Sequence, residues 1–338
     1  MNLPELDSHL PDPADLVVTP DEADTYVKSL EDRPGVEITT WPQRGGRSAY
    51  RVTLGTQGKP HVYFTRPHSH EPAGTAACFE WIRRLSSPSD DWSETVLAEF
   101  RISFMPDANP SGSQRSPVKF WDGSEIPNEE FFLWMFGESG DVEGERFPRV
   151  ATWDMREVTN PRILGIAYEQ IDEHNYVEPN RDHRSTFFRA YFDLHAQEPV
   201  DVWLDLHQTE YVNSEHNTHV NLPTAFEQLE SDLAKLYQGL ADEIHGRWRA
   251  EGANPYSEPR LTYPNRKDQF DFLHAVWAPV STETLHLVTE VQNNNTRTPV
   301  LTQVRLQMAA MDQALRFTRE RQSELGDVLG ETRERGSS

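Results

Sequence analysis

Three short polar fragments, each following an apolar, β-prone run, constrain the fold of this chain more than any other feature. The fragments are residues 67–72, 204–207 and 289–291. Runs of this length rich in β-branched and aromatic residues predict strands. Each fragment is therefore expected where a strand delivers its last residues to the edge of a sheet. Together they bring imidazole and carboxylate groups from distant parts of the sequence.

Helical and strand patterns alternate along the whole chain. Apolar residues at helical spacing predict helices at 20–30, 73–85, 185–194, 223–251 and 301–317. β-prone runs predict strands at 36–40, 50–54, 61–65, 96–105, 200–206 and 285–291. This alternation favours an α/β fold with helices on both faces of the sheet. Ligands in such folds gather beyond the carboxyl ends of strands, where the three fragments are expected.

The charge balance argues against one class of partner. Lys and Arg number 32 against 55 Asp and Glu, giving a formal net charge of −23. Such a surface repels phosphate backbones, so no nucleic-acid partner is expected. A solvated acidic face is the simplest explanation. Adaptation to a salty host, or a basic partner docked on the acidic stretch 113–160, would give the same bias.

No membrane or export segment is apparent in the sequence. No apolar run approaches the roughly 20 residues that span a bilayer. The N-terminus lacks the basic and apolar regions of an export signal. Cys78 is the only cysteine, so no intrachain disulfide is possible. We therefore expect a cytoplasmic protein without a membrane partner, and the oligomeric state stays open.

Composition suggests one domain with flanking segments. Residues 1–20 are rich in proline and acids and are expected to form an N-terminal arm. Residues 21–322 carry the regular patterns of the domain. Within them the acidic, glycine-containing stretch 113–160 is expected to be an insertion or lid. Residues 323–338 are expected to be a polar C-terminal tail.

The first fragment contains a His-x-x-Glu pair, whose spacing lets one turn of chain present both side chains to one ion. The pattern alone is weak, because it occurs three times, starting at His68, His195 and His207. Context favours His68 with Glu71, since they follow an apolar strand that fixes the backbone. His207 also follows a strand, with Asp205 nearby as an acceptor for its ring N–H. Two histidines, a glutamate and an open position suit a hydrolytic zinc site.

The ordered fragments resemble motifs of the zinc carboxypeptidase family, the relatives of carboxypeptidase A, and of the related succinylglutamate desuccinylase/aspartoacylase-type deacylases. The resembling segments are 67–75 for the first metal-binding motif, 180–183 for the Asn-Arg element, 202–207 for the third-ligand strand and 287–290 for the catalytic glutamate. The resemblance spans roughly residues 20–320. It implies a single domain with a mixed, mostly parallel central sheet.

The resemblance also implies a role for the groups at the centre. His68, Glu71 and His207 would hold one Zn²⁺. Glu290 would take the proton from the attacking water and deliver it to the leaving amine. Arg115, shortly after a turn that resembles a family element, is the candidate donor to the oxyanion. A plain surface arginine is the alternative for Arg115.

A second set of residues is implied to bind the substrate. Asn180 and Arg181 would grip a terminal carboxylate, for which the planar guanidinium is suited. The alternative for Arg181 is an ordinary surface ion pair with one of the acids close to it in sequence, Glu173, Glu178 or Asp182. Tyr263 is the candidate for the family's mobile tyrosine, and the sequence does not decide between it and Tyr256.

These features predict a zinc metallohydrolase that cleaves an amide or peptide bond next to a free carboxylate. The alternative enzyme is a deacylase or amidase acting on a small N-acyl amino acid, with the 113–160 insertion crowding the pocket. The substrate is accordingly a peptide or an N-acyl amino acid. A catalytically silent binding module is a different class, and the presence of all four core groups argues against it.

Overall fold

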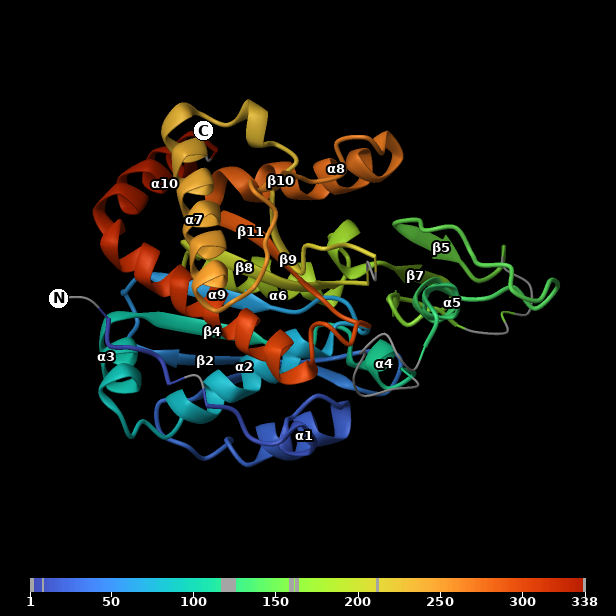
Figure 1. Ribbon diagram of the computed structural model, residues 1–338, viewed down its shortest axis with the longest axis horizontal. Helices are drawn as coiled ribbons and strands as arrows, with labels where there is room; N and C mark the ends of the chain where they lie inside the picture. Colours follow the sequence, from blue (N-terminus) through green and yellow to red (C-terminus); the bar gives the residue numbers. More distant parts are fainter. Residues whose placement is uncertain are drawn as a thin grey trace.

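An eight-stranded sheet lies at the centre of the computed structural model, which describes residues 3–7, 9–116, 126–157, 161, 164–210 and 213–336 (Figure 1). The strands lie in the order β1-β2-β4-β3-β8-β11-β9-β10. Their bounds are β1 Glu37–Pro42, β2 Ser48–Gly55, β3 His61–Thr65, β4 Arg101–Met105, β8 Val202–Thr209, β9 Thr218–Leu222, β10 Arg260–Leu261 and β11 Leu285–Gln292. The four central strands β4, β3, β8 and β11 run parallel, and antiparallel pairs flank them. The mixed, mostly parallel sheet is confirmed.

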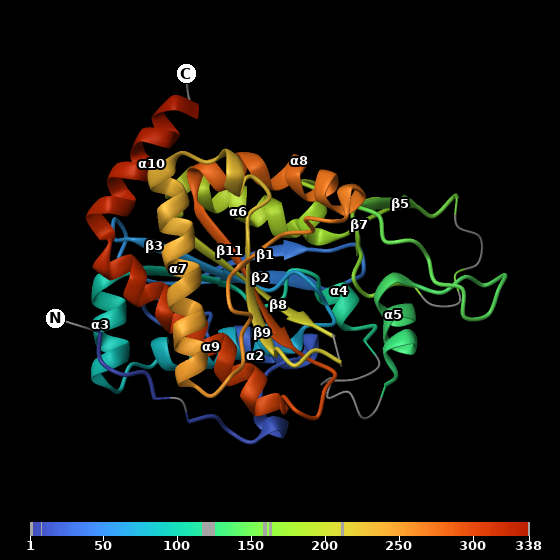
Figure 2. The same cartoon turned by 45° about the horizontal axis from the view of Figure 1, so that its top comes forward.

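Helices cover both faces of this sheet (Figures 1 and 2). One face packs against α1 Pro20–Lys28, α2 Pro72–Leu85, α3 Asp91–Glu99, α7 Ser231–Ala250, α9 Val300–Glu320 and α10 Gln322–Gly336. The other packs against α6 Thr186–Gln197 and α8 Lys267–Glu283. Alternate strand residues enter the two cores: Val62 and Phe64 face the first, and Tyr63 faces the second. The predicted α/β fold is therefore confirmed.

A smaller unit stands at one end of the molecule (Figures 1 and 2, green). It contains α5 Asn128–Phe136 and a three-stranded antiparallel sheet of β5 Thr152–Asp154, β6 Glu169–Gln170 and β7 Asn175–Val177, preceded by the short α4 Pro110–Ser113. Phe131, Met135, Tyr168 and Tyr176 form part of its own apolar cluster. This unit covers most of the described part of the expected insertion 113–160. Residues 117–125 and 158–160 of that insertion lie outside the described residues.

Two predicted elements differ from the structure. The run 96–105 holds the end of α3 and then β4, so the prediction of one strand is wrong for its first part. The Asp90 carboxylate accepts a hydrogen bond from the Ser93 N–H (2.7 Å), which caps α3, and Trp92 and Val96 share its buried face. The helix predicted from residue 223 begins only at Ser231, after a short 3-10 turn.

Both ends of the chain are docked more closely than their composition suggests. The expected polar tail 323–338 is mostly the helix α10, whose Leu325 and Leu329 lie in the main core. In the expected arm 1–20, Leu3 and Leu6 are buried in the same core. Arg316 donates to the carbonyl oxygen of Leu3 (2.8 Å), which ties the arm to α9. Among the helices of the described residues, none has the length and hydropathy of a membrane-spanning segment.

Candidate metal centre

A buried arginine holds the loop after β3 in one shape. Arg66 donates to the carbonyl oxygen of His68 (2.9 Å) and to the hydroxyl of Thr75 (2.8 Å), and it pairs with Asp107 (2.9 Å). Because Arg66 is only 1% exposed, water does not compete for these bonds. They fix the backbone that presents His68 and the first turn of α2.

The first turn of α2 also lies directly against β8. A Cβ atom at Gly74 would sit 3.0 Å from the Leu206 side chain, closer than ordinary van der Waals contact, so glycine suits this close approach. The N–H of Ala73 donates to the side-chain oxygen of Gln208 (2.9 Å). Glu71, the N-cap residue of α2, is thereby held beside the strand that carries the second histidine.

The parallel pairing of β8 and β11 brings two further groups together. Glu290 on β11 lies opposite His207 on β8. On the other side of β11, His219 of β9 lies opposite Glu290. Residues paired across neighbouring strands share one face of a sheet. The carboxyl ends of β3, β8 and β11 therefore meet at one place, as the sequence pattern predicts.

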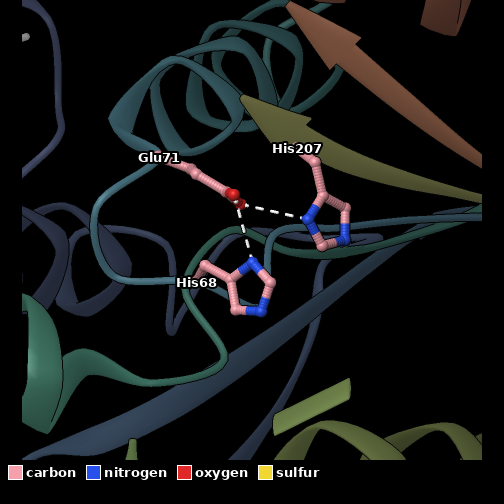
Figure 3. Close-up of side chains that lie close together, drawn as sticks. All are labelled: His68, Glu71 and His207. Carbon is pink, nitrogen blue, oxygen red and sulfur yellow. Dashed lines mark hydrogen bonds and ion pairs between the residues drawn. The ribbon is translucent and has the colours of Figure 1, made fainter. Parts of the chain in front are cut away.

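His68, Glu71 and His207 converge on one point (Figure 3). One ligand atom from each lies within 4.8 Å of the others, and all three side chains are buried. Nδ1 of His68 is 3.1 Å from Oε1 of Glu71, and Nδ1 of His207 is 3.3 Å from Oε2. Within the described ranges, this is the only group of three or more such residues close enough to hold a metal ion.

The surroundings of the two imidazoles fit a cation at this point. The outer nitrogens face other carboxylates: Nε2 of His68 is 3.1 Å from Glu178, and Nε2 of His207 is 2.8 Å from Asp205. A neutral imidazole has one N–H, so it can serve only one of its two carboxylates. At His207, an Nε2 that donates to Asp205 leaves the Nδ1 lone pair pointing towards Glu71, whereas Nε2 of His68 lies near Glu178 without a hydrogen bond. This is the donor set and the outer support typical of a His-His-Glu zinc site.

Neighbouring charges outweigh burial in setting the pKa values of the three candidate ligands. Burial lowers the pKa of His68 and His207, but the adjacent carboxylates outweigh it and raise both pKa values. Burial raises the pKa of Glu71, but the two imidazoles hold it well below its usual range. The carboxylate is thus ionised in a cluster that attracts positive charge.

Glu290 and Glu210 are carboxyl groups of a different kind. Burial raises the pKa of Glu290 to about 8, and the nearby Glu71 and Glu210 carboxylates add to the rise. Burial also raises the pKa of Glu210 to about 7. Both side chains line the same cavity as the three candidate ligands. A divalent cation in the cluster would favour their ionised forms.

The predicted substrate-binding residues meet in the wall of the same cavity. Asn180 and Arg181 lie in a short 3-10 turn, Pro179–Arg181, and line the cavity together with Tyr263. Arg181 donates to the Tyr263 hydroxyl (3.5 Å). Tyr256 is not among the lining residues, so the structure places Tyr263, and not Tyr256, at the site.

Glu178 joins this wall to the metal centre. It is fully buried and pairs with Arg149 and Arg181, while its Oε1 contacts His68. Burial would raise its pKa, but the two guanidinium groups hold it well below the usual range. Arg181 is therefore paired with a neighbouring acid, as its alternative interpretation expects. That pair lies inside the cavity wall and not on the surface.

Arg115 is not brought to the site. Its guanidinium donates to the carbonyl oxygens of Ser111 (2.8 Å), Gly165 (3.1 Å) and Tyr168 (3.1 Å), and it does not line the cavity. Arg115 thus ties the turn after β4 to the smaller unit. Arg149 lines the cavity instead and donates to the Tyr263 hydroxyl (2.9 Å).

Three lining or supporting residues were not assigned a role at the site from the sequence. The sequence did offer a reason to consider Glu178, because it stands only two residues before Asn180 of the Asn-Arg element. Glu210 belongs to a His-x-x-Glu pair with His207, but its role as a second carboxyl beside Glu290 needs the sheet register. Arg149 lies in the insertion, where no pattern points to the site.

The cavity itself is large enough for a small peptide end. Its volume is about 340 Å³. It is lined by the three candidate metal ligands, by Arg149 and Arg181, and by residues of β9 and β10. His70 lines it too, with Nε2 3.4 Å from Glu71 and its ring stacked on His68. Burial lowers the pKa of His70 to about 4, so it stays neutral beside the cluster.

Solved structures with the same fold are metallocarboxypeptidases. The chain is similar to a putative carboxypeptidase from Burkholderia mallei, with 16% identity, a TM-score of 0.55, and coverage of 89% of this chain and 68% of that one. It is similar to a Pseudomonas aeruginosa metallo-carboxypeptidase in complex with (2-guanidinoethylmercapto)succinic acid, with 14% identity, a TM-score of 0.52, and coverage of 90% and 69%. A third is carboxypeptidase A from Helicoverpa armigera, with 11% identity, a TM-score of 0.52, and coverage of 89% and 72%.

No family model matches the sequence, and no curated protein matches it either. The likeness is therefore one of fold: the chain has a zinc carboxypeptidase-like fold, as its ordered motifs predict. At identities this low, the argument for chemistry rests on the residues of the site itself.

Proposed function

We propose that this chain is a zinc-dependent hydrolase of the carboxypeptidase type, which cleaves an amide or peptide bond next to a free carboxylate. One observation carries the proposal: ligand atoms of His68, Glu71 and His207 lie within 4.8 Å of one another. Glu290 lines the same cavity, on the strand next to His207. Three metal ligands and an adjacent carboxyl group are a set of groups that supports metal-assisted hydrolysis.

A zinc ion on these ligands would polarise the scissile carbonyl and acidify the attacking water. Glu290 takes the proton of that water and returns it to the leaving nitrogen. Its half-buried setting suits this task, since a carboxyl whose pKa is near neutrality both accepts and gives a proton. Asp205 keeps the His207 imidazole oriented by accepting its Nε2–H, and Glu178 lies in ionic contact with Nε2 of His68.

Asn180, Arg181 and Tyr263 orient the substrate in the cavity. Arg181 and Asn180 bind the terminal carboxylate. The guanidinium carbon of Arg181 lies 5.8 Å from the centroid of the Tyr263 ring. Arg149, in place of Arg115, donates to the oxygen that becomes negative in the transition state. Arg149 suits this role because it lines the cavity and its other partner, Glu178, also contacts His68.

A deacylase acting on a small N-acyl amino acid is the second candidate. The smaller unit favours it, because Met135 and Arg149 of that unit both reach the cavity and reduce the room for a long peptide. Both candidates need a free carboxylate on the product amine.

One comparison tests these proposals. Zinc-loaded protein is assayed on an N-blocked dipeptide, on the same dipeptide as its C-terminal amide, and on an N-acetyl amino acid. A carboxypeptidase cleaves the first and not the second, and a deacylase prefers the third. Activity must vanish with 1,10-phenanthroline and return with Zn²⁺. Absence of hydrolysis on all three, together with zinc stoichiometry near zero, would reject a hydrolase and favour a binding module.

A further inference from the structure

The cavity extends from the candidate metal ligands across three further strands beyond β8. From β8 the sheet continues through β11 and β9 to β10, and all four strands contribute lining residues. Val288 of β11 pairs with Asn221 of β9, which pairs with Arg260 of β10. Two strand spacings, about 10 Å, separate the backbone of β11 from that of β10. Arg260 thus lies at the far wall, beyond Glu290.

Arg260 differs from the other arginines of the cavity in its partners. Arg149 and Arg181 share the carboxylate of Glu178, and Arg266 pairs with Asp268 (2.9 Å). For Arg260, no carboxylate oxygen of the described residues lies within ion-pair distance. Its guanidinium lies 4.8 Å from the centroid of the Tyr256 ring.

This cation–π contact with Tyr256 holds the guanidinium while using none of its N–H groups in a hydrogen bond. The positive charge is also felt inside the cavity. Burial lowers the pKa of the neighbouring His219 to about 3, and Arg260 adds to the fall. His219 therefore stays neutral and does not compete with Arg260 for an anion.

The guanidinium groups of the cavity differ in how fully they are paired. Its carboxyl groups, Glu71, Glu210 and Glu290, all come from the segments that form the metal end. One guanidinium charge of the Arg149 and Arg181 pair is left over after Glu178 is counted, and Arg260 adds another. One of these positive charges lies beside Glu178 and the other at Arg260, in a chain whose formal net charge is −23. The arrangement is complementary to a dianion.

We propose that Arg260 binds a side-chain carboxylate, so that the residue released by the enzyme is an acidic amino acid. Resting on the proposed function, this assigns the α-carboxylate of that residue to Asn180 and Arg181 and its side-chain carboxylate to Arg260. The guanidinium fork offers such a carboxylate two parallel hydrogen bonds. Val288 and Asn221, between the two ends, form the floor along which the side chain lies.

Hydrolysis of matched substrates tests this assignment. Zinc-loaded protein is compared on N-blocked dipeptides ending in Glu and in Gln, which differ in charge and hardly in shape. We expect kcat/KM to be at least tenfold higher for Glu. Arg260→Gln should remove most of this preference by lowering the value for Glu while leaving that for Gln within about twofold. Equal rates for Glu and Gln in the unchanged protein, or an equal loss on both in the variant, would overturn the assignment.

Arg266→Gln is the matched control, because it removes an arginine that lines the same cavity but is already paired. Its Glu-to-Gln ratio should equal that of the unchanged protein, and a reduced ratio would contradict a specific role for Arg260.

Binding separates this inference from the proposed function. Calorimetric titration with free L-glutamate and free L-glutamine needs no turnover. Tighter binding of glutamate that is lost in Arg260→Gln supports the assignment even if no substrate is cleaved, and the hydrolase proposal then fails alone. Equal binding of the two amino acids overturns the assignment whether or not hydrolysis occurs.

Discussion

Oδ2 of Asp205 lies 2.8 Å from Nε2 of His207, two residues further along the same strand. Residues two apart on a strand point to one face, so this contact follows from local geometry. Asp205 is itself held by the hydroxyl of Thr65 (2.8 Å). A carboxylate in this position fixes the tautomer and orientation of the histidine and strengthens it as a ligand.

Replacing Asp205 by Asn should therefore weaken zinc binding without removing a ligand. We expect the affinity for Zn²⁺ to fall by about 10–100-fold, since the shape is kept and the negative charge is lost. Competition with a chromophoric chelator measures it. His70→Ala is the control: it removes a histidine of the same loop that is not among the candidate ligands, and its zinc affinity should stay unchanged. If His70→Ala bound zinc more weakly than Asp205→Asn does, His70 would have to be counted among the metal ligands.

Replacing Glu290 by Gln should separate catalysis from metal binding. The amide cannot accept the proton of the attacking water, so kcat should fall by about 10²–10⁴-fold. Zinc stoichiometry should remain that of the unchanged protein, because Glu290 is outside the ligand cluster. Steady-state rates and metal analysis on the same sample measure both. A variant with nearly full activity would remove Glu290 from the mechanism.

Arg149→Lys and Arg115→Lys should distinguish the two candidate oxyanion donors. Lysine keeps the charge but not the planar fork, so Arg149→Lys should lower kcat about 10²-fold. Arg115 binds three backbone carbonyls away from the cavity. Arg115→Lys should lower the melting temperature and leave kcat within about twofold. The reverse pattern would restore the assignment made from the sequence.

The sequence predicts most of what positions the metal centre, and the reason is physical. His68, His207 and Glu290 each follow or end a strand whose apolar pattern is strong, and parallel strands bring their carboxyl ends to one edge. The pairing of Glu290 with His207 then needs no long-range information beyond strand order. Asn180, Arg181 and Tyr263 also meet as expected.

Residues outside such patterns could not be predicted in this way. Arg149 and Arg115 both lie in or beside an insertion without clear periodicity, so only the fold decides which of them enters the cavity. Arg260 sits on the two-residue strand β10, too short to produce a pattern. At the C-terminus, Leu325 and Leu329 are too few to mark an amphipathic helix among polar neighbours, and they are buried because α7, α8 and α9 offer a surface.

That docked helix gives a stability prediction. Leu329 is fully buried, so Leu329→Ala removes apolar contacts and leaves a cavity, and it should lower the free energy of unfolding by about 2–5 kcal/mol. Denaturant titration measures the change. Asp327→Ala, at an exposed position of the same helix, should change it by less than about 0.5 kcal/mol. Equal effects of the two substitutions would mean that α10 does not pack as described.

Glu169 should make stability depend on pH. It is buried on β6, where Oε2 accepts the N–H of Thr186 (2.9 Å) at the start of α6 and Oε1 accepts its hydroxyl. Burial raises its pKa to about 7, in spite of these hydrogen bonds. The unfolded chain has the ordinary value, about 4.3. Between these values the folded state binds more protons than the unfolded state.

The contribution of Glu169 to the free energy of unfolding is therefore fully present below about pH 4.3, and it is lost as the pH rises towards 7. At about 1.4 kcal/mol for each pKa unit, the loss has an upper limit of about 3–4 kcal/mol. Glu169→Gln resembles the protonated form, so it should come close to the unchanged protein near pH 4 and exceed its stability by a growing margin between pH 5 and pH 8. Denaturant titrations across this range measure the difference, with the exposed Glu258→Gln as a control for the loss of one charge. A difference that does not grow between pH 5 and pH 8 would show that Glu169 is ionised throughout.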